Sequence, residues 1–278
     1  MTEKRNLPVG VFDSGVGGLT VAKEIMRQLP EENIIYFGDT ARVPYGNKSR
    51  ETVTAYSRQI VEFLLAKGVK ALVVACNTAS AFALETIRDE VPVPIIGVVK
   101  PGARTAARTT RNGRIGVIGT DATIRSGLYN TYLKEIEPQV EVFGVACPLL
   151  VSLAEEGWTD DPITEAIIKR YIEPLLEKNI DTLVLGCTHY PLLRHAVGKV
   201  AGENVQLVNP AYETACELKK ILTESGLDRN DGGEVHHRFY VSDGAEKFRD
   251  FANSILPCEI IETKDVNVKV FGSPCNCD

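Results

Sequence analysis

The sequence predicts an α/β fold made of two pseudo-symmetric, doubly wound domains with parallel sheets and the active site in the cleft between them. Three observations lead to this prediction. Short β-branched runs alternate with helical patterns, one local motif occurs twice, and a length of 278 residues suits about two domains. The alternation favours parallel strands with helices on both faces of each sheet.

The expected strands are short apolar runs rich in β-branched residues. They lie at Pro8–Phe12, Ile34–Phe37, Ala71–Ala75, Pro94–Val99, Ile115–Gly119, Val140–Val145, Thr182–Gly186, Val205–Val208 and Phe239–Ser242. Helical patterns occupy most of the intervals between them, so the two kinds of element alternate along the chain.

The clearest expected helix is Glu51–Lys67, because Ser49 is a suitable N-cap and Gly68 a suitable stop. Proline inside a helix removes a hydrogen bond, so we expect Pro174 to kink or split the helix that contains it. The other expected helices are Ala81–Glu90, Ile163–Glu177 and Glu213–Ser225.

Composition narrows the class of partner. The net charge is −6 and no run of lysine or arginine forms a basic stripe, which argues against nucleic acid or an anionic membrane and favours a small-molecule ligand. The N-terminal segment lacks a signal-peptide pattern and no apolar stretch reaches about 18 residues, so we expect a cytoplasmic protein. Seven cysteines, an odd count, fit reduced thiols better than a disulfide framework.

Two of these cysteines occupy the same local context. Cys76 lies in VKALVVACNTAS (69–80) and Cys187 in IDTLVLGCTHYP (180–191), each between an apolar strand and the expected start of a helix. Free backbone N–H groups at a helix start favour a thiolate, so such thiols are expected to ionise more easily. Two of them indicate a paired chemistry.

The repeat extends beyond the cysteines. The turns GVFDSGVGG (10–18) and GVIGTDATIRSG (116–127) each follow a strand and lie about 65 residues ahead of one cysteine. In open α/β sheets, ligands bind outside the carboxyl ends of the strands, where all four segments are expected. Facing domains would therefore bring both turns and both thiols into one cleft.

Two thiols on opposite sides of a carbon atom can invert it, because one thiolate removes a proton while the other thiol delivers one. A histidine two residues after a cysteine can keep that cysteine ionised or relay its proton. The polar neighbours that could support this chemistry are Asp13, Ser14, Asn77, Thr78, Thr188 and His189.

The motifs FDSGVGGLTV, YFGDTARVPYG, VVACNTAS and LGCTHYPLL occur in the order found in bacterial glutamate racemases, and the chain resembles that family over residues 8–260. The resemblance implies interconversion of L- and D-glutamate without a cofactor or metal, and a supply of D-glutamate for peptidoglycan. It also implies two α/β domains with the site between them and, often, a homodimer.

The resemblance assigns roles to individual residues. Cys76 would act on the α-proton of D-glutamate with help from Asp13, and Cys187 on that of L-glutamate with help from His189. Glu155, next to Glu156 in LAEEG, matches an acidic residue near the second base. Substrate contacts would come from Asp13, Ser14, Tyr45, Gly46, Asn77, Thr78, Thr188 and His189, with Thr120 and Thr123 as further candidates.

The same resemblance, together with the repeat, suggests where the domains divide. The first domain would comprise residues 1–99 and 209–278, and the second residues 100–208. We place the crossings near Val99–Pro101 and Val208–Pro210, where a strand meets proline.

Each residue also has a purely structural interpretation. Asp13 and Ser14 could cap the helix that begins near Gly17, and their turn lacks the glycine order and the lysine–serine pair of a phosphate loop. His189 could be a core histidine, Tyr45–Gly46 only a turn, and Asp39 either a cap or a distant charge. Cys147, Cys216 and Cys258 are expected to be packing residues, and Cys275 and Cys277 an exposed, oxidisable tail.

Other functions remain open at this point. The same thiol pair could serve an aspartate racemase or a maleate isomerase, or the cysteines could sense oxidation in a binding protein without turnover. A pyridoxal-dependent racemase would need a lysine in a turn at the carboxyl end of a strand, which the sequence lacks.

Overall fold

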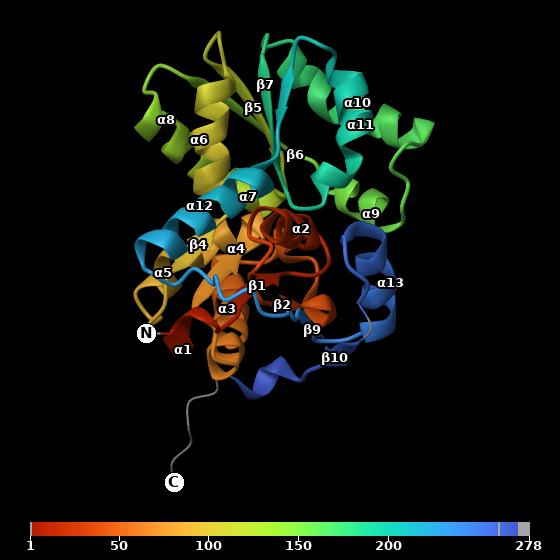
Figure 1. Cartoon of the computed structure of the whole chain (residues 1–278). Helices are drawn as coiled ribbons and strands as arrows, with labels where there is room; N and C mark the ends of the chain where they lie inside the picture. The colour runs from red at the N-terminus through yellow and green to blue at the C-terminus, as the bar shows by residue number, and fades with distance from the viewer. Residues whose placement is uncertain (1, 261, 272–278) are drawn as a thin grey trace.

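The computed structural model describes residues 2–260 and 262–271, which form two parallel sheets covered by helices (Figure 1). The larger sheet has six strands in the order β10-β9-β2-β1-β3-β4. Its strands are β1 (Val9–Asp13), β2 (Ile34–Gly38), β3 (Ala71–Val74), β4 (Ile95–Gly97), β9 (Arg238–Val241) and β10 (Thr263–Asp265).

The smaller sheet has four strands in the order β6-β5-β7-β8. They are β5 (Arg114–Gly119), β6 (Glu141–Ala146), β7 (Thr182–Gly186) and β8 (Gln206–Val208). Every strand pair in the described residues is parallel.

The two sheets repeat one topology. The order β2-β1-β3-β4 in the larger sheet matches β6-β5-β7-β8 in the smaller one, and in each the chain leaves the first strand to one side and returns on the other. The crevice at the carboxyl ends of the two central strands is where doubly wound folds bind ligands. The prediction of two pseudo-symmetric, doubly wound domains is therefore confirmed.

The larger sheet is buried between two layers of helices, as expected for parallel strands. One face packs against α2 (Leu19–Gln28), α12 (Pro210–Glu224) and α13 (Ala245–Ile255). The other face packs against α3 (Arg50–Ala66), α4 (Asn77–Phe82) and α5 (Leu84–Arg88).

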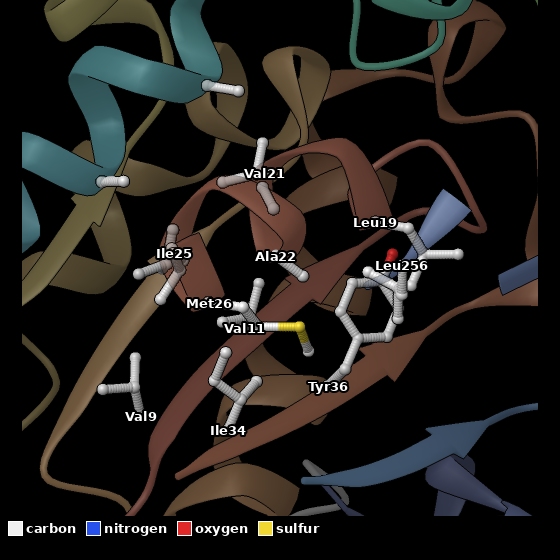
Figure 2. Packing of buried hydrophobic residues seen from close by; sticks show 14 of the residues in the cluster. Val9, Val11, Leu19, Val21, Ala22, Ile25, Met26, Ile34, Tyr36 and Leu256 are labelled. Carbon is white, nitrogen blue, oxygen red and sulfur yellow. The ribbon is translucent and has the colours of Figure 1, made fainter. Parts of the chain in front are cut away.

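Figure 2 shows the first of these layers, in which Val11 and Tyr36 of neighbouring strands lie against Ala22 and Met26 of α2. Burying one large apolar side chain contributes roughly 1.5–3 kcal/mol, so a layer of this kind fixes the position of β1 firmly. The last residue of β1 is Asp13, which this core places at the carboxyl edge of the sheet.

The smaller sheet has the same two layers. One contains α9 (Leu149–Glu155), α10 (Pro162–Leu176) and α11 (Arg194–Ala201), and the other contains α6 (Val99–Thr109) and α8 (Leu128–Ile136). The remaining elements are short: α1 (Thr2–Arg5), α7 (Asp121–Arg125), η1 (Thr40–Arg42), η2 (Tyr45–Asn47), η3 (Tyr190–Leu193) and η4 (Val268–Val270).

Two helices, α6 and α12, carry the chain between the sheets, and they contact each other. Arg104 of α6 pairs with Glu217 of α12 at 2.6 Å. The prediction of a strand up to Val99 is wrong, because β4 ends at Gly97 and Val99 begins α6. Pro101 fits there because the N–H that proline lacks would have no helical partner in the first turn.

Two further expectations about helices need correction. The helix expected at residues 81–90 is two short helices, α4 and α5, and α4 begins early because Cys76 is its N-cap. Pro174 does not split α10, because it lies in the last turn, where few backbone hydrogen bonds follow it. None of the described helices is long and apolar enough to cross a membrane.

Candidate active site

A cavity of about 120 Å³ lies where the carboxyl ends of the two sheets meet, and both predicted thiols line it. Cys76 follows β3 and Cys187 follows β7, and the side chains are almost completely buried. The full lining is Ser14, Val43, Pro44, Tyr45, Gly46, Cys76, Asn77, Thr78, Thr120, Val151, Ser152, Glu155, Cys187, Thr188 and His189.

The first thiol, Cys76, lies at the start of α4 as predicted. Its Sγ accepts a hydrogen bond from Ala79 N at 3.5 Å and lies 3.7 Å from Ser14 Oγ. Burial nevertheless raises the pKa of Cys76, as does the charge of Asp13, and the hydrogen bonds with Ala79 and Ser14 offset this only in part. The expectation of easier ionisation is wrong for this thiol, because desolvation outweighs the helix start.

The second thiol has a different neighbour. Cys187 Sγ lies 3.7 Å from His189 Nδ1, and His189 Nε2 lies 2.9 Å from Glu155 Oε1. Burial acts to lower the pKa of His189, but its hydrogen bonds to Cys187 and Glu155 raise this pKa to about 10. The hydrogen bond with His189 lowers the pKa of Glu155. Cys187, His189 and Glu155 thus form a line along which a proton can move to or from sulfur.

Asp13 holds the turn after β1 in place and lies close to the thiols. Its Oδ2 accepts hydrogen bonds from Gly15 N at 3.1 Å and Gly18 N at 3.0 Å, and Gly18 is the N-cap residue of α2. The other oxygen, Oδ1, is buried without a hydrogen-bond partner among the described residues. Burial raises the pKa of Asp13, while the charge of His189 opposes this. Asp13 lies just behind the cavity wall.

The turn after β1 touches the turn that carries the second thiol. A Cβ atom on Gly17 would lie 2.5 Å from His189 Nδ1 and 2.6 Å from Thr188 Oγ1. Thr20 Oγ1 donates a hydrogen bond to Thr188 O at 3.0 Å. Gly17 is therefore a point of close approach between the two halves, and a larger residue there would force His189 or Thr188 to move.

Neutral polar groups supply most of the cavity's hydrogen-bonding capacity. Thr78 Oγ1 lies 2.9 Å from Thr120 Oγ1 and 3.4 Å from Thr123 Oγ1, which links the two halves through hydroxyl groups. Thr123 belongs to this network without lining the cavity, whereas Ser14, Asn77 and Thr188 line it. None of the described residues that line the cavity is lysine or arginine.

Tyr45 and Gly46 also line the cavity. The buried carboxylate of Asp39 holds Tyr45 in place. The Tyr45 hydroxyl donates a hydrogen bond to Asp39, which also accepts from Ser242 Oγ at 2.8 Å and pairs with Arg42 at 2.7 Å. Asp39 occupies the cap position of η1 but makes no capping bond through its side chain. Its side chain does not line the cavity and instead anchors Tyr45.

Several residues of the cavity wall were not among the predicted site residues. Val43 and Pro44 lie within the motif YFGDTARVPYG but have no reactive group, and Val151 and Ser152 of α9 lie in no quoted motif. The described residues hold no cluster of three or more histidine, cysteine or acidic side chains arranged for a metal ion.

The other cysteines behave in different ways. Cys147 packs in the core of the smaller sheet and Cys258 against that of the larger sheet, as predicted, and Cys216 is a partly buried free thiol on α12. Cys275 and Cys277 lie outside the described residues.

A sequence model of the Asp/Glu/Hydantoin racemase family matches residues 10–217, a segment that contains both thiols and both turns. The chain belongs to this family. The match covers well over half of the sequence, and it includes the whole of the smaller sheet and most of the larger one.

Individual relatives agree with this assignment. A glutamate racemase from Geobacter metallireducens is 51% identical over 94% of this chain and 97% of its own length. Among solved structures, a glutamate racemase isoform from Bacillus anthracis has a TM-score of 0.90 at 44% identity and covers 94% of this chain and 98% of its own. A Francisella tularensis glutamate racemase in complex with D-glutamate also has a TM-score of 0.90, at 38% identity over 96% and 100% of the two chains.

Proposed function

We propose that this protein is a glutamate racemase that inverts the α-carbon of glutamate by two-base proton transfer between Cys76 and Cys187. The observation that carries the proposal is that two thiols from equivalent strand ends of two similar sheets line one cavity of about 120 Å³. The names of the relatives, and the D-glutamate complex among them, support glutamate as the substrate.

In the proposed reaction, a thiolate takes the α-proton from one face, and the electron pair of the broken C–H bond stays on the substrate as a carbanion stabilised by the carboxyl group. The thiol on the opposite face then gives its proton to that carbon. One sulfur gains the proton that the other loses, so no oxidant, metal or organic cofactor is required. Cys76 serves the D-enantiomer and Cys187 the L-enantiomer.

The two thiols receive different help in this scheme. His189 exchanges a proton with Cys187 and is oriented by Glu155, whose carboxylate lies 2.9 Å from the ring. Asp13 is fully buried and does not line the cavity, so it assists the first thiol from behind, with its unpartnered Oδ1 as the site that can hold a proton. Substrate carboxylates are held by neutral donors of Ser14, Asn77, Thr78 and Thr188, with Tyr45 and Gly46 closing one wall.

The wider role follows from the family. We assign residues 1–99 and 209–278 to one domain and residues 100–208 to the other, which agrees with the membership of the two sheets.

The product D-glutamate would serve bacterial peptidoglycan synthesis, and hence cell wall formation and cell shape, in the cytoplasm. A homodimer is the expected assembly, which light scattering can measure.

The decisive experiment is a circular-dichroism assay with purified protein, L-glutamate and no added cofactor. We expect the signal to decay to zero as the mixture becomes racemic. The same assay with L-aspartate tests the nearest alternative substrate. A glutamate signal that stays constant even at high enzyme concentration and long incubation would contradict the proposal. If only the aspartate signal decayed, the substrate would be aspartate instead.

A further inference from the structure

We infer that Tyr129 is a positioning residue for substrate binding, because it fixes the orientation of the Asn77 side-chain amide across the boundary between the two halves. This inference rests on the proposed function. The contact that carries it is a hydrogen bond of 2.8 Å from the Tyr129 hydroxyl to Asn77 Oδ1.

The helices that carry the two residues, α8 and α4, belong to opposite halves of the molecule (Figure 1). Tyr129 lies on α8, which packs against the smaller sheet, and Asn77 is the first residue of α4, directly after Cys76. Tyr129 is 4% exposed and Asn77 3% exposed, so the bond is shielded from water. A hydrogen bond in such surroundings is costly to leave unmade.

The surroundings of the tyrosine ring leave it little freedom. A Cβ atom on Gly102 of α6 would lie 3.1 Å from the Tyr129 hydroxyl, and one on Gly186 at the end of β7 would lie 3.2 Å from its ring. Two glycines therefore make the space through which the ring reaches Asn77. Packing against Gly102 and Gly186 thus holds the Tyr129 side chain in one position.

In the structure the Tyr129 hydroxyl donates and the carbonyl oxygen of Asn77 accepts. A phenol has one proton to donate, and burial raises the pKa of Tyr129, so the proton stays on oxygen. Among the described residues, Asn77 Oδ1 is the only hydrogen-bond partner of this hydroxyl. Because Asn77 Oδ1 accepts from Tyr129 in the structure, the NH₂ side of the same amide points the other way.

The NH₂ side is free for a ligand. In the described part of the chain, Asn77 Nδ2 has no hydrogen-bond partner, and it is not among the fully buried atoms that lack one. Asn77 lines the cavity beside Cys76. An oriented NH₂ group there offers a donor to a carboxylate of the substrate, whereas a rotated amide would present its oxygen and repel that carboxylate.

Tyr129→Phe removes only the hydroxyl and tests the inference directly. We expect the KM for both enantiomers of glutamate to rise about tenfold with kcat changed by less than about threefold, because the variant loses a preset donor and not a reacting group. The melting temperature should fall by no more than a few degrees, because the variant leaves one buried acceptor, Asn77 Oδ1, without its donor.

The same helix supplies a matched control. Tyr132 of α8 also donates a hydrogen bond to the other half, to Glu85 Oε1 at 3.1 Å, but at an exposed site away from the cavity. Tyr132→Phe should leave KM unchanged. A rise in KM of equal size in both variants would mean that any tie between the halves has this effect, and the inference would fail.

A double-mutant cycle separates positioning from stability. If Tyr129 acts through Asn77, then Tyr129→Phe should not weaken D-glutamate binding further in an Asn77→Ala background, as measured by calorimetric titration. Additive losses, or a lower melting temperature with unchanged KM in the single variant, would overturn the inference. Absence of inversion in the unaltered protein would overturn the proposed function and this inference together, whereas normal inversion with an unchanged KM in Tyr129→Phe overturns the inference alone.

Discussion

The two halves of the molecule present the same thiol at the same place in the same topology, yet they surround it differently. Cys76 has Ser14 Oγ at 3.7 Å and a buried carboxylate, Asp13, behind it, while Cys187 has an imidazole at 3.7 Å that is itself paired with Glu155. Burial raises the pKa of Cys76, whereas the partner of Cys187 is a histidine whose pKa is raised to about 10. The fold duplicates the position of the sulfur, and the local sequence gives each sulfur different neighbours, which is the basis of our proposal that each thiol serves one enantiomer.

The largest expected effect comes from removing either sulfur. Cys76→Ala and Cys187→Ala should each lower racemisation by at least about 10³-fold, because a one-thiol site can remove a proton but cannot return it to the opposite face. Cys216→Ala, which alters a thiol on α12 outside the cavity, is the control and should be fully active. Chiral chromatography of the product measures the rates.

The same variants reveal which thiol serves which enantiomer. In D₂O, Cys187→Ala should still exchange the α-hydrogen of D-glutamate, and Cys76→Ala that of L-glutamate, each without inversion. Proton NMR of the recovered amino acid records the loss of the α signal. Exchange of the opposite enantiomer in each variant would reverse our assignment, and exchange of both in either variant would show that a single thiol reaches both faces.

A smaller effect is expected from the carboxylate behind the histidine. Glu155→Gln should lower kcat about tenfold and shift the alkaline limb of the pH–rate curve to lower pH by roughly one unit, because the bond from Glu155 helps to raise the pKa of His189. Glu156→Gln, at the exposed neighbouring position, is the matched control. An alkaline limb that stays in place in Glu155→Gln would show that protonated His189 is not required.

The smallest effect concerns stability. The pKa of His189 is about 10 in the folded protein against 6.5 for a free side chain, so its contribution is fully present below about pH 6.5 and is lost as the pH rises toward 10. The unaltered protein should therefore lose about 1–2 kcal/mol more than His189→Gln between about pH 6.5 and pH 8. Urea unfolding at a series of pH values provides the comparison. If the free energy of unfolding changed with pH in the same way for both proteins, His189 would be neutral in the folded state.

Structural features that are encoded by residues close together in the chain could be predicted from the sequence. The strand–cysteine–polar motif located both thiols because a buried strand and a helix start are encoded within a few residues, and its repetition indicated two similar sheets. Helix α6 was missed because Val98 and Val99 continue the apolar run of β4, so only tertiary packing decides where the strand ends. Pro101 was interpreted as a boundary, although the first turn of a helix tolerates it.

Long-range contacts could not be read in this way. Nothing in the sequence around Tyr129 indicates that its hydroxyl meets Asn77, since the two residues are far apart in the chain and meet only when the halves pack. The raised pKa of Cys76 was missed for a similar reason, because the motif shows the N–H groups of the helix start but not the depth of burial that outweighs them.

Gly17 has no reactive atom, yet it sets how near the sulfurs can stand to a shared carbon. One extra carbon at this position would meet the ring of His189 at 2.5 Å and act as a wedge between the halves. All the acidic, basic and hydroxyl groups of the site would then be unchanged, but the distance between a sulfur and the α-carbon of a bound substrate would be too long for proton transfer. In the proposed reaction, the spacing of the two sulfurs would thus depend on a residue that has no side-chain carbon.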